Sequence, residues 1–409
     1  MTAPPEPVYR RRDFAQFVGA RFLSSIAMQV QSVAVGWQIY DLTRDPLALG
    51  LVGLCQFVPM FLLALPAGDI SDRFDQRRVF CASVIAQAVA SATFLVLTLT
   101  QVHATWPFYA VLVFFGASRG FAGPASQSLL PFLVPRESLQ RALAWGSSSF
   151  QGAVLVGPAL GGFLFVLGPS FAYAACCASF LAAGVAVVFV GGRRRAANAQ
   201  GLATAVERVT EGVHFVRTRP VILGALSLDL FAVLLGGATA LLPIFARDIL
   251  HAGPLGLGFL RSAPALGAAL VGVTFGRRPL ERHAGPAMFA AVFMFGIATI
   301  VFGLSTNFWL SLAALAILGA ADMVSVFIRQ SLVQMATPDA MRGRVSAVNM
   351  LFIGASNELG EFESGFTAAW FGTVPAVVIG GLGTLVVVAT WMGVFPPLRR
   401  VDRLASISP

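Results

Sequence analysis

Long apolar stretches separated by short polar connections recur along the chain, from Phe14 almost to the C-terminus. Each is about as long as the roughly 20 helical residues that cross a hydrocarbon core of about 30 Å. The alternation typical of barrel strands is missing, and glycine and proline are scattered through the stretches, which membrane helices tolerate. We therefore predict an all-α membrane protein with twelve spanning helices. The predicted spans are residues 14–40, 46–67, 79–100, 107–128, 145–166, 169–191, 221–246, 256–276, 285–305, 308–328, 345–370 and 374–396.

Composition and charge agree with a membrane protein and indicate its orientation. Hydrophobic residues make up 57% of the 409 residues, charged residues only 11%, and the mean hydropathy is +0.78, which excludes an ordinary soluble globule. All 28 basic residues are arginines, and the odd-numbered connections hold only Arg44 and Arg247. The positive-inside rule therefore predicts that both termini are cytoplasmic. The arginine-only usage indicates a GC-rich bacterial genome, and hence a multi-pass protein of a bacterial inner membrane.

The sequence contains two related halves. The longest polar connection, residues 192–220, divides the spans into six and six, and valines three or four residues apart predict an amphipathic helix within it. The segment "QSLLPFLVPRESLQRALA" from Gln127 matches "QSLVQMATPDAMRGRVSA" from Gln330 at an offset of 203 residues. Two six-helix halves in the same orientation form a parallel repeat, with binding expected near the midplane. The predicted domains are 1–13 (cytoplasmic N-terminal segment), 14–191 (N-terminal half), 192–220 (cytoplasmic linker), 221–396 (C-terminal half) and 397–409 (cytoplasmic tail).

No feature of the sequence points to an enzyme. A G-x-x-x-x-G-K-[ST] phosphate loop is absent, the four histidines are dispersed among connections, and the four cysteines lie in or beside apolar stretches without metal-binding spacing. We therefore expect no catalytic residue, no metal and no cofactor. The net charge of +9 is explained by arginines beside spans, so we also expect no nucleic-acid partner.

The connection between the second and third spans carries an ordered motif, "GDISDRFDQRR". Gly68 permits a close helix approach, and Asp72 suits a helix N-terminus or an arginine partner. Inner-side charge comes from Arg73, Arg77 and Arg78. We interpret the motif as a breakable cytoplasmic latch. The alternative is a charged loop that only fixes the topology.

Two further motifs lie inside predicted spans. "SRGFAG" places Arg119 in the fourth span, where a buried arginine needs a partner. "GPALGG" in the fifth span offers small residues for helix contact and a proline for a bend. Its residues are Gly157, Pro158, Gly161 and Gly162. Helix packing alone is the alternative explanation for this second motif.

These three motifs and the pattern of the whole chain resemble the major facilitator superfamily. The first is similar to that family's G-x-x-x-D-R-x-G-[RK]-[RK] signature, although Asp75 replaces the usual second glycine and Gln76 a usual basic residue. The second resembles its R-x-x-x-G motif, which is linked to proton coupling in antiporters, and the third resembles a motif associated with exporters. Stretches such as "VGWQIYDLTRDPLALGLVG" resemble the bacterial branch that contains the enterobactin exporter and related drug exporters. The resemblance implies outward transport of siderophores or drugs.

Charged residues inside the spans occupy equivalent positions in the two halves. Arg119 falls at the repeat position of Asp322, and a weaker upstream offset of 208 residues places Arg21 at the position of Asp229. Spans 1, 4, 7 and 10 line the central cavity in the family fold, so the resemblance implies ion pairs that form and break during alternating access. Alternatively, Arg21 and Asp229 lie near helix ends and only extend to water.

The stretch "SNELGEFESG" carries three glutamates at membrane depth in the eleventh span. Glu358 lies 14 residues beyond Arg344, about 21 Å along a helix, which is past the midplane. A charge at that depth costs about 2.5–3.5 kcal/mol, so these side chains face protein or water, or bind protons. Glu358 and Glu361 share a helix face, and we predict that this pair carries protons. A structural network with Asn357 or Ser356 is the alternative.

The sequence therefore predicts a secondary active transporter, namely a proton-coupled exporter of a small amphipathic molecule such as a siderophore or drug. The predicted coupling and gating residues are Glu358, Glu361, Asp229, Asp322, Arg21 and Arg119. Expected partners are the small-molecule substrate, protons and the lipid bilayer, and we expect a monomer driven by the proton gradient. The alternatives are a proton-linked importer of a nutrient and a transport-inactive membrane sensor or scaffold.

Overall fold

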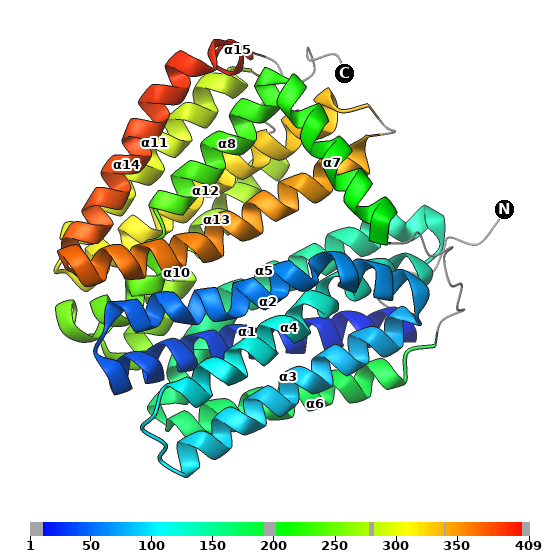
Figure 1. The fold of residues 1–409 in the computed structure, drawn as a ribbon, viewed down its shortest axis with the longest axis vertical. Helices are drawn as coiled ribbons and strands as arrows, with labels where there is room; N and C mark the ends of the chain where they lie inside the picture. Colours follow the sequence, from blue (N-terminus) through cyan, green and yellow to red (C-terminus); the bar gives the residue numbers. More distant parts are fainter. Residues whose placement is uncertain (1–10, 192–201, 278–281, 339–340, 403–409) are drawn as a thin grey trace. The chain divides into compact units, whose positions relative to one another are not determined.

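The structure, a computed structural model, describes residues 11–191, 202–277, 282–338 and 341–402. Within these ranges, the side chains of Leu65, Asp72, Arg136, 202–206, Arg208 and Ala347 are not described. All regular secondary structure in the described ranges is helical (Figure 1). The predicted all-α class is therefore confirmed.

Long helices alternate with short connections. The helices up to residue 191 are α1 (Arg12–Thr43), α2 (Pro46–Arg73), α3 (Gln76–Leu99), α4 (Trp106–Leu129), η2 (Leu130–Phe132), η3 (Arg136–Ser138), α5 (Leu139–Val166) and α6 (Pro169–Val188). The later helices are α7 (Leu202–Thr218), α8 (Pro220–Leu235), η4 (Ala238–Leu241), α9 (Leu242–Ile244), η5 (Phe245–Ile249), α10 (Gly253–Arg277), α11 (Ala284–Leu304), α12 (Phe308–Ala336), α13 (Arg342–Phe371), α14 (Thr373–Val394) and α15 (Pro396–Arg399).

Nine helical stretches of the described residues are long and apolar enough to cross a membrane. They lie in α2, α3, α5, α6, the α8–η5 region, α10, α11, α12 and α14. The other long helices, α1, α4 and α13, contain more polar positions, including Arg119 in α4 and three glutamates in α13. A multi-pass helical protein is thus supported, whereas the number twelve and the side of the termini stay predictions.

The described residues fall into two compact units, and the chain crosses between them three times. It passes from the first unit to the second at Ile39, returns at Cys55 and passes again to the second at Val206. The end of α1 and the start of α2 therefore belong with the later helices. These units follow spatial contacts and do not test the predicted domain boundaries.

In the first unit, polar side chains join α1 to α3 and α6. Ser91 donates a hydrogen bond to Gln31 Oε1, and seven residues further along both helices Gln38 Nε2 donates to Thr98 Oγ1 at 3.1 Å. Tyr173 of α6 donates its hydroxyl to Gln38 Oε1 at 2.6 Å. Hydrogen bonds between helices satisfy polar groups that have no water partner in hydrocarbon. The same bonds fix the register of α1 on α3.

In the second unit, α10 and α12 pack with their backbones in contact. A Cβ at Gly319 would lie 2.0 Å from the carbonyl oxygen of Pro264, and one at Gly267 would lie 1.8 Å from that of Ala316. Only glycine fits such a separation. An apolar core closes the space where α8, α11, α12 and α14 meet. Its fully buried members include Leu228, Met288, Phe289, Ile328 and Leu332.

The helix of the linker, α7, packs against the start of α13. Arg344 Nη1 lies 2.6 Å from Glu211 Oε2, and a Cβ at Gly212 would lie 2.8 Å from the carbonyl oxygen of Arg344. Val216 is buried in the same cluster as Val345. The linker therefore contacts α13, the helix that carries the glutamates.

The predicted span 221–246 is interrupted rather than continuous. α8 ends at Leu235, and Gly236 and Gly237 precede the short helices η4, α9 and η5. Glycine is a poor helix former, and Pro243 removes a backbone donor within the following turns. The last of these, η5, is a π-helical turn over Phe245–Ile249. The side chains before and after the break thus point in directions that a continuous helix would not give.

Candidate functional site

A buried ion pair in the second unit connects α8 to α12. Arg329 Nη1 donates to Asp229 Oδ2, and Ser325 Oγ donates to Asp229 Oδ1 at 3.4 Å. Arg329 is 1% exposed and Asp229 is 4% exposed. Removing two charges from water is costly, and their attraction compensates only where further hydrogen bonds complete the pair. Two charges this deep in an apolar helix core are therefore a candidate for function.

Asp322 adds a second carboxylate to this pair. It lies seven residues before Arg329 on α12, two helical turns away and on the same face. Asp229, Asp322 and Ser325 line one cavity of about 10 Å³. Two carboxylates therefore lie with one guanidinium, so the cluster carries a net negative charge unless one carboxylate binds a proton. We call Asp229, Asp322 and Arg329 the acidic cluster.

The guanidinium of Arg329 has donor capacity beyond its bond to Asp229. Its Nε is buried and finds no acceptor among the described residues. Buried donors are rarely left unpaired in folded proteins. The free donor suits a second acceptor, such as a water.

Arg329 is the member of the cluster that sequence reasoning missed. The predicted tenth span ends at residue 328, which puts Arg329 in a cytoplasmic connection, but α12 continues to Ala336 and buries the arginine. The signal was present in the spacing, because Arg329 follows Asp322 by two turns and Ser325 by one. The repeat offset identified Asp229 and Asp322, but it predicted arginines of the other half as their partners.

The two arginines that were predicted to pair with Asp229 and Asp322 lie in the first unit, and each has contacts within that unit. Arg119 Nη1 of α4 donates to Gln56 Oε1 at 3.1 Å. The guanidinium of Arg21 lies beside α5, where a Cβ at Gly146 would be 3.3 Å from Arg21 Nη1. The pairing of Arg21 and Arg119 with the aspartates across the repeat stays a prediction.

The glutamates of α13 lie at partly buried positions. Glu358 and Glu361 are neither fully buried nor fully exposed, and Glu361 packs against the start of α2, where a Cβ at Gly53 would lie 2.9 Å from Glu361 Oε2. Glu363 accepts a hydrogen bond from Thr367 Oγ1 at 2.7 Å. Glu363 thus has a structural partner one turn away, while the proton-carrying role predicted for Glu358 and Glu361 stays a prediction.

The residues of the predicted latch form local contacts at the α2–α3 connection. Arg73 Nε pairs with Asp69 Oδ2 at 2.8 Å, and Arg77 Nε donates to the carbonyl oxygen of Val187 in α6 at 2.9 Å. Asp75 caps α3 by accepting from Arg77 N at 3.1 Å. Arg78 Nε lies 3.8 Å from Asp75 Oδ2.

No described atom lies within 4 Å of a Cβ placed on Gly68. The role of this glycine in a cytoplasmic latch stays a prediction. The side chain of Asp72 lies outside the described part.

The glycine motif of α5 packs closely against α1. A Cβ at Gly157 would lie 2.6 Å from Gln29 Cβ, and one at Gly161 would lie 3.0 Å from Val30 Cα. Pro158 and Gly162 are buried in the same helix. The motif therefore has a packing role in the first unit, and its link to export direction stays a prediction.

Similar sequences cover almost the whole chain. A family profile described as "Transmembrane secretion effector" matches residues 4–408. The "Uncharacterized MFS-type transporter YfiS" of Bacillus subtilis (strain 168) is 25% identical over 399 residues, which cover 92% of each chain. The enterobactin exporter EntS of Shigella boydii serotype 18 is 24% identical over 388 residues, which cover 93% of this chain and 91% of the relative.

Solved structures of transporters share the fold. A bacterial homolog of the human lysosomal transporter Spinster, in an inward-facing and occupied conformation, has a TM-score of 0.74 at 13% identity and covers 95% of this chain and 97% of its own. A D-xylose–proton symporter has a TM-score of 0.70 at 15% identity with the same coverage. Because the profile match runs over nearly the full length and the fold agrees with it, this chain belongs to the transmembrane secretion effectors of the major facilitator superfamily, a family of membrane transporters rather than enzymes.

Proposed function

We propose that this chain is a proton-coupled exporter in a bacterial inner membrane, which moves a small amphipathic molecule, a siderophore or a drug, by alternating access. Proton coupling is supported above all by the acidic cluster of Asp229, Asp322 and Arg329. Outward transport is supported by the enterobactin exporter relatives, which align over most of both chains.

The charge count of the acidic cluster favours a site for one exchangeable proton. With both carboxylates ionised, one negative charge is unbalanced in an apolar surrounding, and one proton neutralises it. Asp229 already accepts hydrogen bonds from Arg329 and Ser325. Asp322 is therefore the carboxylate that takes up and releases the proton, and Arg329 is the fixed counter-charge.

Proton exchange in this cluster is able to drive a conformational change. α8 and α12 each contribute one carboxylate, so protonation of Asp322 removes a repulsion between these two helices and deprotonation restores it. Glu358 and Glu361 on α13 provide a second acidic site in the same unit. A cargo that competes with the proton for one of these sites is expelled as protons enter.

A proton-linked importer is the second candidate. Its support is the fold that this chain shares with a D-xylose–proton symporter, and at 15% identity this similarity shows the fold alone. A transport-inactive sensor or scaffold is the third candidate, and a buried ion pair with an unbalanced carboxylate argues against it, because such a cluster is costly to keep without a use.

The decisive experiment measures accumulation of dyes, antibiotics and a catecholate siderophore in efflux-deficient bacterial cells that express this protein. The variants are Asp322→Asn and the double variant Glu358→Gln/Glu361→Gln. Asp402→Asn is the matched control, because it neutralises a carboxylate in the second unit that pairs with the exposed Arg282 at 3.6 Å. Membrane levels of all variants are equalised before comparison.

An exporter lowers accumulation of at least one compound, and a protonophore abolishes the effect. We expect Asp322→Asn to lose this export and Asp402→Asn to keep it. Export that persists in Asp322→Asn but is lost in the double glutamate variant would move proton coupling to α13. Accumulation that rises above that of cells without the protein, and depends on the proton gradient, would instead identify the importer.

A further inference from the structure

A groove of about 580 Å³ lies between the linker helix α7 and the start of α13. Ligand pockets in proteins have volumes of about 300–1,000 Å³, so a small molecule or a headgroup fits this space. Five side chains of α7, from Thr210 to Thr218, form one wall, and Met341 and Arg344 form the other. We call this space the linker groove. Its lining shares no residue with the acidic cluster or with the glutamates of α13.

A backbone contact fixes the walls of the linker groove. A Cβ at Gly212 would lie 2.8 Å from the carbonyl oxygen of Arg344, and Val216 is buried with Val345 in one apolar cluster. Glu211 Oε2 also joins the two walls, at 2.6 Å from Arg344 Nη1. The side chains of this ion pair are 43% and 37% exposed, and a pair this open to water contributes little. The pair can therefore open without dismantling the groove, which makes Arg344 available to another anion.

The floor of the linker groove is apolar and continues into the membrane-spanning part of the unit. Phe215 and Met341 line the groove and also pack against the buried apolar cluster at the start of α8 and α13. Thr218 lies two residues before Pro220, where an apolar helical stretch long enough to cross a membrane begins. The groove thus lies at the level where the headgroups of a bilayer meet its hydrocarbon. An amphiphile matches this position better than a fully water-soluble ion does.

The hydrogen-bond donors of the linker groove suit a phosphate group. Thr210 and Thr218 donate their hydroxyls to carbonyl oxygens of their own helix, each at 2.8 Å. Arg344 uses Nη1 for Glu211, and its planar guanidinium carries further N–H groups whose geometry matches two phosphate oxygens. The imidazole of His214 adds a donor on the opposite wall. One arginine and one histidine therefore face the same space.

The charge around the linker groove favours an anion. Residues 207–219 and 339–344 contain five arginines and three acids, a surplus of two positive charges that rises to three when His214 is protonated. Among these arginines, Arg217, Arg219 and Arg342 are exposed. The guanidinium carbon of Arg219 lies 5.5 Å from the centre of the Phe215 ring, close to the lining of the groove. Basic pockets beside membrane helices are typical sites for anionic lipid headgroups.

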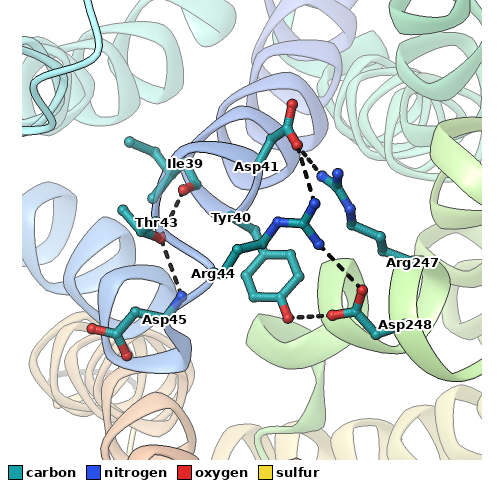
Figure 2. A network of polar contacts seen from close by, with 8 residues as sticks. All are labelled: Ile39, Tyr40, Asp41, Thr43, Arg44, Asp45, Arg247 and Asp248. Carbon is teal, nitrogen blue, oxygen red and sulfur yellow. Dashed lines mark hydrogen bonds and ion pairs between the residues drawn. The ribbon is translucent and has the colours of Figure 1, made fainter.

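A second charged network in the same unit lacks such a surplus. In the network of Figure 2, Asp41 pairs with Arg247, and Arg44 Nη1 lies 3.5 Å from Asp248 Oδ1. Tyr40 donates its hydroxyl to Asp248 Oδ2. Each arginine of this network has an acidic partner, so the network offers no excess positive charge to a ligand. The linker groove is therefore the stronger candidate for an anion site.

We propose that the linker groove binds the phosphate headgroup of an anionic phospholipid. Arg344 and His214 donate to the phosphate, while Phe215 and Met341 contact the glycerol and the first part of the acyl chains. Binding draws Arg344 away from Glu211 and connects the linker helix and the start of α13 to the bilayer surface. The predicted orientation places this site in the inner leaflet. The inference depends neither on proton coupling nor on any cargo.

The test measures binding of defined lipids to the purified full-length protein in mild detergent by native mass spectrometry. The probes are dioleoyl phosphatidylglycerol and dioleoyl phosphatidylcholine, which differ in net charge and share their acyl chains. Arg344→Gln removes one charge and one donor, and we expect phosphatidylglycerol to bind about fivefold more weakly. Arg282→Gln is the matched control, because Arg282 is an exposed arginine of the same unit that pairs with Asp402 at 3.6 Å. We expect the control to keep the native affinity.

Glu211→Gln provides a test of the opposite sign. It removes the carboxylate that competes with the phosphate for Arg344, so phosphatidylglycerol should bind about twofold more tightly. A variant that had lost its structure would bind more weakly instead. Weaker binding by Glu211→Gln in a monodisperse protein would contradict the competition between the carboxylate and the phosphate.

A cysteine at Thr218 locates the lipid. The native cysteines at positions 55, 81, 176 and 177 are first replaced by alanine or serine. In nanodiscs, the reaction of this cysteine with a water-soluble maleimide should become about threefold slower when phosphatidylglycerol replaces phosphatidylcholine. A cysteine at the exposed Gln140 of α5 corrects for the general effect of an anionic surface.

Four outcomes would overturn the proposal. They are equal affinity of the native protein for both lipids, equal affinity of Arg344→Gln and Arg282→Gln for phosphatidylglycerol, and a cysteine at position 218 that the lipid does not protect. The fourth is displacement of phosphatidylglycerol by millimolar inorganic phosphate, which would identify a free phosphate as the ligand. Absence of any transported compound would refute the proposed function and leave these binding results intact.

Discussion

Replacing Arg329 by methionine should be the most damaging single change in the acidic cluster. Methionine nearly keeps the volume of the side chain and removes its charge, which leaves the buried Asp229 and the half-buried Asp322 without a counter-ion. Asp322→Asn is the opposite change, because it leaves the neutral Asp229–Arg329 pair intact. Each variant changes the charge of the site by one unit, in opposite directions. The difference between their effects on stability therefore reports the contribution of the charge balance.

The magnitude follows from burial. With side-chain exposures of 2% for Arg329 and 6% for Asp229, water does not compensate for a lost partner. Removal of one partner from such a pair costs about 3–5 kcal/mol. This corresponds to a thermal midpoint lower by about 6–20 °C, at about 2–4 °C per kcal/mol for folding units of 150–250 residues. For Asp322→Asn we expect the free energy of unfolding to change by no more than about 1 kcal/mol, because this substitution removes an unbalanced charge.

The assay measures thermal unfolding of the purified variants in the same detergent. Its readout is the fraction of the protein that stays monodisperse as the temperature rises. The double variant Asp229→Leu/Arg329→Met completes a mutant cycle and should recover part of the loss caused by Arg329→Met, because no charge is then left unpaired at Asp229. Equal destabilisation by Asp322→Asn and Arg329→Met would refute the charge-balance reasoning, since volume and hydrogen bonding alone would then explain both.

Three further predictions concern packing, the linker and topology. Gly319→Ala should destabilise the second unit by about 1–3 kcal/mol or more, because its Cβ would lie 2.0 Å from a backbone oxygen of α10, whereas Gly276→Ala, with open space around it, should not. Glu211→Gln should change the thermal midpoint little, because its pair with Arg344 is 43% and 37% exposed and worth about 1 kcal/mol at most. A cysteine at Ala104 should react with an impermeant maleimide added to intact cells; reaction only after lysis would contradict the predicted orientation.

Sequence reasoning located the acids but not their counter-ion. The repeat offset led to Asp229 and Asp322 because a duplicated chain places equivalent residues at equivalent depths. It also favoured partners in the other half, since opposite signs occupied matching positions. Arg329 was not predicted as a member of the cluster because an arginine lowers the hydropathy of a segment equally in water and when buried beside an aspartate. A span predicted from hydropathy therefore ends before this residue.

The same physical limit explains the differences in helix bounds. α12 continues to Ala336 because backbone hydrogen bonds extend a helix beyond its apolar residues, whereas α8 stops at Leu235 inside an apolar run because two glycines and a proline follow. The assignment of residues 39–54 to the second unit had no local signal at all. It depends on contacts between segments some 200 residues apart in sequence, such as Tyr40 with Asp248, which periodicity does not detect.

Asp75 gives a reason for the one irregular position in the α2–α3 motif. It occupies the place where the superfamily signature has a glycine, and in the structure that place is the N-cap of α3. Exchanging aspartate for glycine at an N-cap costs only a few tenths of a kcal/mol, whereas alanine or an aliphatic residue costs about 1 kcal/mol. This position of the signature therefore requires a residue that can start a helix. It does not require the absence of a side chain. A search pattern that accepts Asp, Asn, Ser or Gly at this position would gather chains that a strict glycine pattern discards.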